Sequence, residues 1–306
     1  MDHRQATQLL TDVHRVVTGV IRGADESIAT IVATLAADGH VLLEDPPGTG
    51  KTTLVHTLGR ACGLDVSRIQ GTPDLLPGDI TGHLLPDEQR RLVFHPGPVF
   101  AQLVLADELN RTPPRSQAAL LEAMAERTVT VDRETHALPT PHLVVATQNP
   151  TESAGTFPLP DSQLDRFTVR VSLGQPEQID EMALVRANLA GSLLEDVPAV
   201  CDADQLLAVQ ELVRTVPVDD AVLGYATALT RATREEPAVR QGASARATVQ
   251  LARLAQAFAT LAGRPQVLAE DVKRAAVPVL AHRIVMASGD ARQLVDRLLG
   301  SLPVPR

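Results

Sequence analysis

One stretch near the start of the chain limits its possible folds more than any other part. Residues 40–53 read HVLLEDPPGTGKTT, a short apolar run followed by prolines, glycines and a lysine. An apolar run of this length that ends in turn residues predicts a buried strand. Gly48 and Gly50 let backbone N–H groups converge on an anion at the N-terminus of the following helix. The stretch therefore predicts a strand, a phosphate-binding loop and a helix.

The side chains of this loop suit a nucleotide. Lys51 places a compact positive charge for the β- and γ-phosphates of ATP, and the hydroxyl of Thr52 is placed to bind Mg²⁺. Lys51 and Lys273 are the only lysines of the chain, so a compact ammonium has been kept where a nucleotide needs one. An arginine-rich composition with one lysine left by accident would look the same. We expect the phosphates to be bound by a continuous run of residues: Pro47, Gly48, Thr49, Gly50, Lys51, Thr52 and Thr53.

Asp45 stands where the pattern G-x-x-x-x-G-K-[ST] has its first glycine. A short carboxylate at the end of a strand can hydrogen-bond its own backbone, and we expect it to be tolerated there. If it pointed inward, it would repel the phosphates. The alternative interpretation, a chance Gly-Lys-Thr in a surface turn, does not explain the strand before the loop and the helix after it.

A second signal follows the apolar run at residues 102–106. This run predicts another buried strand, which ends directly in Asp107-Glu108. A carboxylate at the carboxyl end of a strand beside a glycine loop is where Mg²⁺ is held, so we expect Asp107 to bind the ion with Thr52 or through a water. Glu108 is then placed to orient and polarise the water that attacks the γ-phosphate. An ordinary exposed acidic strand end is the alternative.

A third polar signal is Asn149, which follows the apolar run at residues 143–146. The amide of an Asn at a strand end can hydrogen-bond to the γ-phosphate or to the attacking water. Taken alone, Asn149 would be a turn residue. Its position after a strand that follows both earlier signals favours the functional interpretation.

Composition argues against several other classes of protein. The chain has 306 residues, enough for one large or two ordinary domains, and its net charge of −9 disfavours non-specific binding to nucleic acid. The histidines lack paired metal-ligand spacing, and Cys62 and Cys201 lack a C-x-x-C pattern, so we expect two reduced cysteines and no zinc site. No apolar run has the length of a membrane helix, and the N-terminus lacks a signal-peptide pattern, so we expect a cytoplasmic protein.

The pattern of the chain changes near residue 176. Before that point, strand-length apolar runs alternate with helical patterns, and residues 168–171 predict a fifth strand. After it, helical periodicity dominates and no further strand is expected. We therefore expect an α/β nucleotide-binding domain over residues 1–176 and a helical domain over residues 177–306. Ser244 suits the N-cap of the clearest helix, and Arg246 lies in the first turn, where a cation is unfavourable; such a conflict often marks function.

On these residues the chain resembles the MoxR family of AAA+ ATPases over nearly its whole length. Several stretches carry the resemblance, and together they are far more specific than a phosphate loop alone. They are QGTPDLLPGD at 70–79, HPGPVF at 95–100, DELNR at 107–111, QAALLEAM at 117–124, ATQNP at 146–150, LP at 159–160 with QLDRF at 163–167, and GASARA at 242–247.

The resemblance implies an AAA+ core with a five-stranded parallel sheet in the order 5-1-4-3-2, a small all-α lid, and assembly into a ring that is usually hexameric. It identifies Lys51 and Thr52 with Walker A, Asp107 and Glu108 with Walker B, Asn149 with sensor 1, Arg246 with sensor 2, and Arg166 with the arginine finger. Such a finger acts on the nucleotide of the neighbouring subunit, so hydrolysis should depend on assembly. A buried ion pair within the subunit is the alternative for Arg166. Ala245 departs from the family's usual proline, which loosens the start of that helix.

The resemblance also implies a function. Family members commonly work beside a protein with a von Willebrand factor A domain, as chaperone-like remodellers or in metal-cofactor insertion. We therefore expect an ATPase that uses ATP and Mg²⁺ to act on a protein client, with a von Willebrand factor A domain protein as partner. The predicted hairpin at residues 127–138 resembles an insertion that faces the ring pore in related clades; an ornament at the sheet edge is the alternative.

Two other functions stay open at this point. A DNA- or RNA-translocating motor would need basic pore loops, and the sequence offers only Arg90-Arg91, Arg127 and Arg133. A scaffold that binds ATP with little turnover is conceivable because of Asp45. Glu108 and Arg166 argue against such a scaffold, and we do not expect a nucleic-acid partner.

Overall fold

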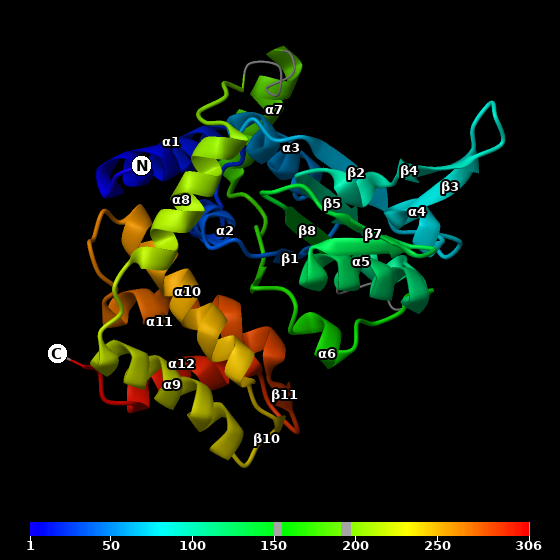
Figure 1. Cartoon of the computed structure of the whole chain (residues 1–306). Helices are drawn as coiled ribbons and strands as arrows, with labels where there is room; N and C mark the ends of the chain where they lie inside the picture. The colour runs from blue at the N-terminus through cyan, green and yellow to red at the C-terminus, as the bar shows by residue number, and fades with distance from the viewer. Residues whose placement is uncertain (150–154, 191–196, 306) are drawn as a thin grey trace.

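The first half of the chain forms a five-stranded parallel sheet (Figure 1). The structure, a computed structural model, describes residues 1–149, 155–190 and 197–305. The strands lie in the order β2-β5-β8-β1-β9. When only these five strands are numbered along the chain, the order is 2-3-4-1-5, so the predicted order 5-1-4-3-2 is confirmed. The strands are β1 (Val41–Glu44), β2 (Val66–Gln70), β5 (Leu103–Asp107), β8 (Leu143–Gln148) and β9 (Val169–Val171).

The two faces of the sheet belong to two separate apolar cores. Side chains alternate along a strand, so Leu43 packs in one core and its neighbour Leu42 in the other. The first core includes residues of α1 (His3–Val20), α2 (Asp25–Ala36) and α3 (Lys51–Ala61). The second includes residues of α4 (Pro77–Thr81) and α5 (Pro114–Glu126), with α6 (Asp161–Leu164) packed beside it. Helices on both faces place the carboxyl ends of the strands at one edge, which is where α/β proteins bind ligands.

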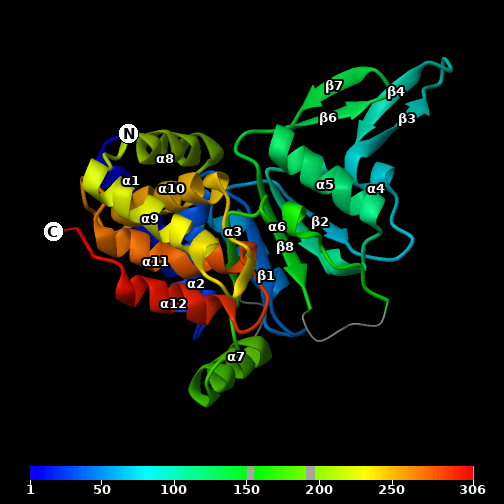
Figure 2. The ribbon, with the colours of Figure 1, turned by 90° about the horizontal axis from the view of Figure 1, so that it is seen from below.

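Two antiparallel hairpins extend from this core (Figures 1 and 2), and the second of them is the hairpin predicted at residues 127–138. Strands β3 (Gly82–Pro86) and β4 (Leu92–Pro96) form the first, and β6 (Thr128–Val131) and β7 (Glu134–Ala137) form the second. The ring of Phe94 in β4 stacks on that of His136 in β7, with 4.1 Å between the centroids. Because the two hairpins touch through this pair, they form one projecting surface.

The second half of the chain is a helical lid, as predicted, with one correction. A short antiparallel ribbon joins β10 (Val239–Gln241) to β11 (Val285–Met286), so the expectation of no strand after residue 176 was wrong. Strands of three and two residues are too short to show the alternation that predicts a strand. The helices are α7 (Gln178–Ala190), α8 (Ala203–Thr215), α9 (Asp220–Glu235), α10 (Ala245–Leu261), α11 (Ala269–Leu280) and α12 (Ala291–Ser301), and the 3-10 turns of the chain are η1 (Pro98–Phe100), η2 (Leu109–Arg111) and η3 (Ala281–Arg283).

The lid packs on the N-terminal helices, while α7 lies apart from the other helices (Figure 2). The Thr7 hydroxyl of α1 donates to the Thr260 carbonyl of α10 over 2.8 Å, and the Gln210 amide of α8 donates to the Leu35 carbonyl of α2 over 2.9 Å. One apolar core therefore runs from α1 and α2 into the lid. The division of the chain after residue 176 stays a prediction. In the described part of the chain, no helix is both long and apolar enough to cross a bilayer.

The two cysteines are reduced, as predicted; both are buried, and their thiols lie close together. Cys62 follows α3, and Cys201 precedes α8; the amide of Cys201 donates to the Ala61 carbonyl over 3.2 Å. A hydrogen bond between the two thiols raises the pKa of Cys62 well above its usual value and lowers that of Cys201. The pair lies inside the apolar core that joins α3 to the lid.

Two histidines beside the sheet are buried and neutral. The Nδ1 atom of His40 accepts from the Val144 amide over 3.0 Å, so Nε2 carries the proton and faces the Met124 carbonyl at 3.3 Å. Burial lowers the pKa of His40 well below its ordinary value. For His142, burial and the nearby Arg127 lower the pKa from 6.5 to about 4. Both imidazole rings are therefore neutral, which is the protonation state with the smaller desolvation penalty on burial.

Burial of His142 predicts that the free energy of unfolding falls with pH between pH 6.5 and about pH 4. Below pH 6.5 the unfolded chain binds a proton at His142 that the folded chain refuses until about pH 4, so stability falls as pH drops through that window. At pH 5 the loss from this residue should be about 2 kcal/mol. Urea unfolding of wild type and His142→Gln at pH 7 and pH 5 measures it, because the deficit of the variant should shrink by that amount at pH 5. An unchanged deficit would contradict the assignment.

Candidate functional site

The loop after β1 is open and ready to receive an anion. Gly48 and Gly50 both adopt φ of +86°, a conformation that side chains disfavour, and no atom lies within 4 Å of the position of a Cβ at Gly48. The Lys51 ammonium donates to the carbonyls of Asp45 at 2.8 Å and Pro46 at 2.9 Å. Lys51 is thus bound by neutral carbonyls of its own loop, which a phosphate can replace as a stronger partner.

Asp45 points away from the loop. Its carboxylate accepts from the Ser172 hydroxyl at 2.5 Å and from the amides of Leu173 at 2.9 Å and Gly174 at 3.2 Å. The side chain is 1% exposed, so it binds the segment after β9 and not, as we expected, its own backbone. Three donors satisfy the charge, and the carboxylate does not face the place of the phosphates.

Asp107 and Glu108 lie at the carboxyl end of β5, joined by a residue that the sequence did not single out. The Thr147 hydroxyl donates to Asp107 Oδ1 over 2.7 Å and accepts from the Glu108 amide over 2.8 Å. Thr147 is 1% exposed and is the last residue but one of the neighbouring strand β8. The other carboxylate oxygen of Asp107 pairs with Arg68 of β2 at 2.6 Å. One hydroxyl therefore fixes both acidic residues with respect to each other.

Glu108 has a strained backbone and a cationic neighbour. Its φ and ψ are 54° and 47°, a left-handed conformation that costs roughly 1–3 kcal/mol for a residue with a side chain. A carboxylate oxygen of Glu108 pairs with Arg111 at 3.2 Å. Gly71 lies directly against this turn, where an added Cβ would be 2.2 Å from the Glu108 carbonyl oxygen. The glycine of the QGTPD stretch is therefore required by close packing beside the acidic pair.

These parts surround one cavity of about 370 Å³. It is lined by Pro47, Gly48, Gly50, Lys51, Thr52, Thr53, Asp107, Glu108, Thr147, Gln148 and Asn149. Of the predicted phosphate-binding run, only Thr49 is outside this lining. Asn149 is 8% exposed, and its carbonyl accepts from the Asn110 amide at 3.3 Å. Pro150, which ends the predicted ATQNP stretch, lies outside the described residues.

The donors of this cavity fit Mg²⁺ that arrives with a nucleotide. Asp107 and Thr52 offer hard oxygen ligands, which Mg²⁺ prefers. Among the described residues, no cluster of His, Cys, Asp or Glu could hold a metal by itself. Mg²⁺ usually keeps only one or two protein ligands and takes the rest from phosphates and water, so this sparse donor set is what such an ion needs.

Arg166 and Arg246 do not line this cavity. Arg166 follows Asp165 in the chain, and Arg246 lies near the Asp165 carboxylate. Arg246 is 4.0 Å from the Asp165 carboxylate and 57% exposed. Arg166 is partly exposed, and within the described ranges no ion pair or side-chain hydrogen bond holds its guanidinium. The buried ion pair of this region is formed by a different residue. Arg283 is 2% exposed and pairs with Asp165 at 2.7 Å.

Arg283 attaches the lid to the segment that carries Arg166. Its guanidinium also donates to the carbonyls of Phe167 and Thr168. Burial lowers the pKa of Arg283 to about 10, against the effect of Asp165, so it stays charged. The Ser244 hydroxyl, at the start of α10, lies 3.3 Å from the same carboxylate. Asp165, which precedes Arg166, is thus bound by two parts of the lid, Arg283 and Ser244. Sequence analysis missed this link between the lid and the segment that carries Arg166.

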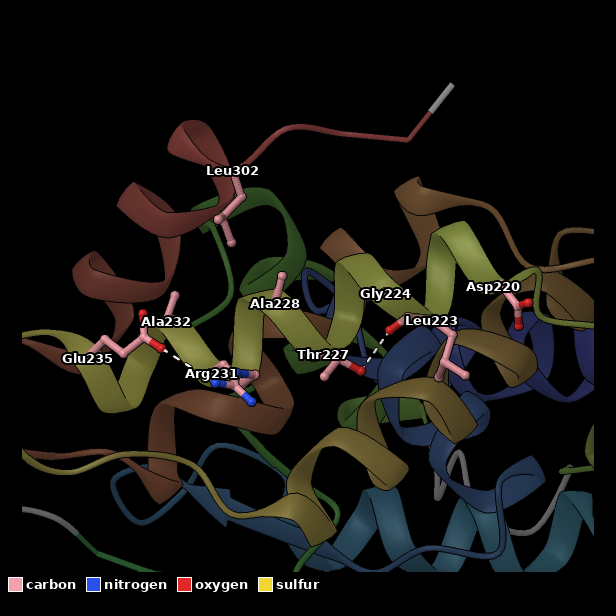
Figure 3. Close-up of a pocket in the computed structure, with 9 residues that line it drawn as sticks. All are labelled: Asp220, Leu223, Gly224, Thr227, Ala228, Arg231, Ala232, Glu235 and Leu302. Atoms are coloured by element: carbon pink, nitrogen blue, oxygen red, sulfur yellow. Dashed lines mark hydrogen bonds and ion pairs between the residues drawn. The ribbon is translucent and has the colours of Figure 1, made fainter.

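A second groove lies on the lid, on the outer side of α9 (Figure 3). It has a volume of about 660 Å³ and is lined by one stripe of α9, from Asp220 to Glu235, and by Leu302. Two of its three charged residues, Arg231 and Glu235, face each other at 4.0 Å, and Asp220 is the third. It contains neither a glycine loop nor a strand end, so the cavity over the P-loop is the candidate site.

Comparison with known proteins agrees with this geometry. Residues 40–169 match the ATPase family associated with various cellular activities (AAA), and residues 231–298 match the AAA lid domain. Chaperone MoxR1 of Mycobacterium tuberculosis is 37% identical over 277 residues, which are 87% of this chain and 73% of MoxR1. The chain belongs to the MoxR-type AAA ATPases.

Two further relatives of this MoxR-type ATPase cover nine tenths or more of the chain. The uncharacterised protein YeaC of Bacillus subtilis is 39% identical over 281 residues, which are 90% of this chain and 88% of YeaC. A crystal structure of a candidate ATPase from Cytophaga hutchinsonii superposes with a TM-score of 0.92 at 33% identity, covering 99% of this chain and 97% of the other. Both the core and the lid therefore have counterparts in known proteins.

Thr147 gives a direct test of how this MoxR-type site is arranged. Thr147→Val keeps the shape but removes the hydroxyl, so Asp107 loses a hydrogen bond and the Glu108 amide loses its acceptor. Removing a hydrogen bond to a charged group should lower kcat about tenfold to 100-fold. The Mg²⁺ concentration for half-maximal ATPase activity should also rise. Thr147→Ser is the matched control and should keep both values near wild type; equal loss in both variants would contradict the role of the hydroxyl.

Proposed function

We propose that this protein hydrolyses Mg-ATP at sites between adjacent subunits of a ring and uses the energy to remodel a protein client. The observation that carries the proposal is the division of the predicted catalytic residues into two groups. Lys51, Asp107 and Glu108 line one cavity, whereas Arg166 and Arg246 lie elsewhere, beside Asp165. A cationic group that does not reach its own nucleotide suits the nucleotide of a neighbour.

Within one subunit, each residue of the cavity has a distinct task. The glycine loop and Lys51 bind the phosphates, and Glu108 accepts the proton of the attacking water. Asn149 hydrogen-bonds to that water or to the γ-phosphate. Thr52 and Asp107 would hold Mg²⁺, which when bound would neutralise negative charge on the phosphates. Glu108 adopts its left-handed backbone conformation directly after β5, and its side chain lines the cavity.

The neighbouring subunit completes the charge balance. Arg166 would stabilise the charge that develops on the γ-phosphoryl group as the bond to the β-phosphate breaks. Arg246 lies 4.0 Å from the carboxylate of Asp165, the residue before Arg166, and would contact the same neighbour. This arrangement supports a ring, because a contact between two different faces repeats around a closed circle. A hexamer, the usual number in the resembling family, is the size we propose.

The projecting hairpins favour a protein client. Around the turn of the first hairpin, Leu85, Leu92 and Val93 are 46%, 67% and 43% exposed. Arg91 pairs with Asp87 at 2.9 Å, which neutralises part of the positive charge at this turn. Exposed apolar side chains suit contacts with protein chains, whereas a nucleic-acid track needs unpaired cations. The relative MoxR1 is named a chaperone, and a von Willebrand factor A domain partner is proposed from the family resemblance.

Assembly-dependent hydrolysis tests this proposal directly. The ATPase rate per subunit should rise steeply with protein concentration, because an isolated subunit lacks the neighbour's arginines. Sedimentation at the same concentrations should show the ring forming over the same range. A rate per subunit that does not change across the assembly transition would exclude sites shared between subunits. DNA and RNA should leave the rate unchanged, and salt-sensitive stimulation by either would argue for a nucleic-acid motor.

A further inference from the structure

A second polar cavity lies at the seam between the sheet and the lid. It has a volume of about 230 Å³ and is lined by residues of β9, α2, α11 and α12. It shares no lining residue with the cavity over the P-loop. We call it the seam pocket, and its charged residues are Arg170, Arg274, Arg292 and Glu26. The mechanism proposed above uses none of them.

The seam pocket gathers positive charge from both halves of the molecule. Arg170 belongs to the core strand β9, Arg274 to α11 and Arg292 to α12, and Glu26 is the one carboxylate in the lining. Like charges held in one concave site repel each other, and this repulsion is relieved when an anion binds between them. Such a cluster therefore has a higher affinity for anions than single surface arginines have.

Neighbouring side chains orient two of the three arginines, but not all of their N–H groups have hydrogen-bond partners among the described residues. Arg274 donates to both carboxylate oxygens of Glu26, at 2.7 and 2.9 Å, and its guanidinium lies 4.2 Å from the centre of the Phe258 ring. Arg170 pairs with Glu44 at 3.4 Å, and its buried Nε–H has no hydrogen-bond partner in the described part of the chain. Within the same part, no ion pair or side-chain hydrogen bond holds Arg292, which is exposed. A guanidinium whose donors are not all used by neighbouring carboxylates can turn them to the oxygens of an anion.

We propose that the seam pocket binds a small phosphorylated anion that bridges the core and the lid. Guanidinium groups present paired N–H donors that match the oxygens of a phosphate, and they form short, strong hydrogen bonds with it. The cavity has room for one or two phosphoryl groups but is small for a whole nucleotide. The inference does not depend on the proposed function.

The seam pocket is connected to the nucleotide site through Glu44. Glu44 pairs with Arg170 on one side and accepts from the Gln148 amide at 2.8 Å on the other. Gln148 lines the cavity over the P-loop. An anion that takes Arg170 would compete with Glu44 and so leave Glu44 free to move. Binding at the seam would therefore change the nucleotide site, and by linkage nucleotide binding would change affinity at the seam.

Titration of the nucleotide-free, Mg²⁺-free protein with inorganic pyrophosphate tests the proposal. Wild type should bind at two sites, the P-loop and the seam pocket, in isothermal calorimetry. Lys51→Ala should remove the first site and keep the second. In that background, Arg292→Gln should weaken the remaining site about tenfold, because a hydrogen bond between charged groups is lost. Arg297→Gln, an equal change of charge on the same helix α12, should have no effect.

Glu44→Gln provides a second test, in which the affinity for pyrophosphate should rise and not fall. In the Lys51→Ala background it should tighten pyrophosphate binding, because Arg170 no longer has a competing carboxylate. Damage to the fold would weaken binding, so a gain cannot come from instability. A single site in wild type that Lys51→Ala abolishes would overturn the proposal. So would equal weakening by Arg292→Gln and Arg297→Gln, or weaker binding in a Glu44→Gln variant whose melting temperature is unchanged.

Discussion

Glu108→Gln is expected to stop ATP hydrolysis while leaving ATP binding intact. The amide has the size of the carboxylate but cannot accept the proton of the attacking water. Loss of a general base lowers the rate by about 10²–10⁴-fold. The phosphate-binding residues and the Thr147 hydrogen bond to the Glu108 amide are not changed by this substitution. Steady-state ATPase rates and equilibrium binding of a fluorescent ATP analogue measure the two parts of the prediction.

The control for this variant is Glu122→Gln on the exposed side of α5. It makes the same chemical change away from the cavity and should keep wild-type activity. If Glu108→Gln hydrolysed ATP at the wild-type rate, a different residue would have to activate the water. The Glu108→Gln variant can also be used to capture a client, because it would stay in the ATP-bound form. Loss of ATP binding in this variant would mean that Glu108 holds the site together and is not the base.

Arg166→Ala is expected to lower hydrolysis by about 10³–10⁵-fold without preventing ATP binding. An arginine finger acts only as charge develops at the transition state, so if Arg166 has this proposed role the ground state should be little affected. The cavity over the P-loop does not include Arg166, so nucleotide affinity should stay near that of wild type. Arg231→Ala on α9 is the control, because its guanidinium is 66% exposed and outside that cavity.

Mixing two inactive variants tests whether Arg166 and Glu108 of one site come from two subunits or from the same subunit. An Arg166→Ala subunit keeps Glu108, and a Glu108→Gln subunit keeps Arg166. In a mixed ring, some interfaces combine the intact residue of each, and activity should return in the mixture. If both residues acted within one subunit, no mixture would recover activity. Recovery should increase with the time allowed for subunit exchange and should be absent when the rings are kept dissociated.

The sheet and the acidic strand ends could be predicted from sequence because their signals are local. An apolar run followed by glycine and lysine indicates β1, its loop and α3, and β5 and β8 have apolar runs of their own. The order of the strands came from the family resemblance and agrees with the structure. The β10–β11 ribbon was missed because its strands are too short to show a pattern.

The sequence by itself determined the residue types at the glycine loop with Lys51 and at the acidic pair that ends β5, and from these we predicted the chemistry; the roles of Arg166 and Arg246 were predicted from the family resemblance. Only the tertiary structure decided how they are arranged. It placed Thr147 between the two acidic residues, turned Asp45 toward the segment after β9, and attached the lid to Asp165 through Arg283. The reason is that a buried polar group must find a hydrogen-bond partner wherever the fold brings one, and most of these partners are far away in the sequence.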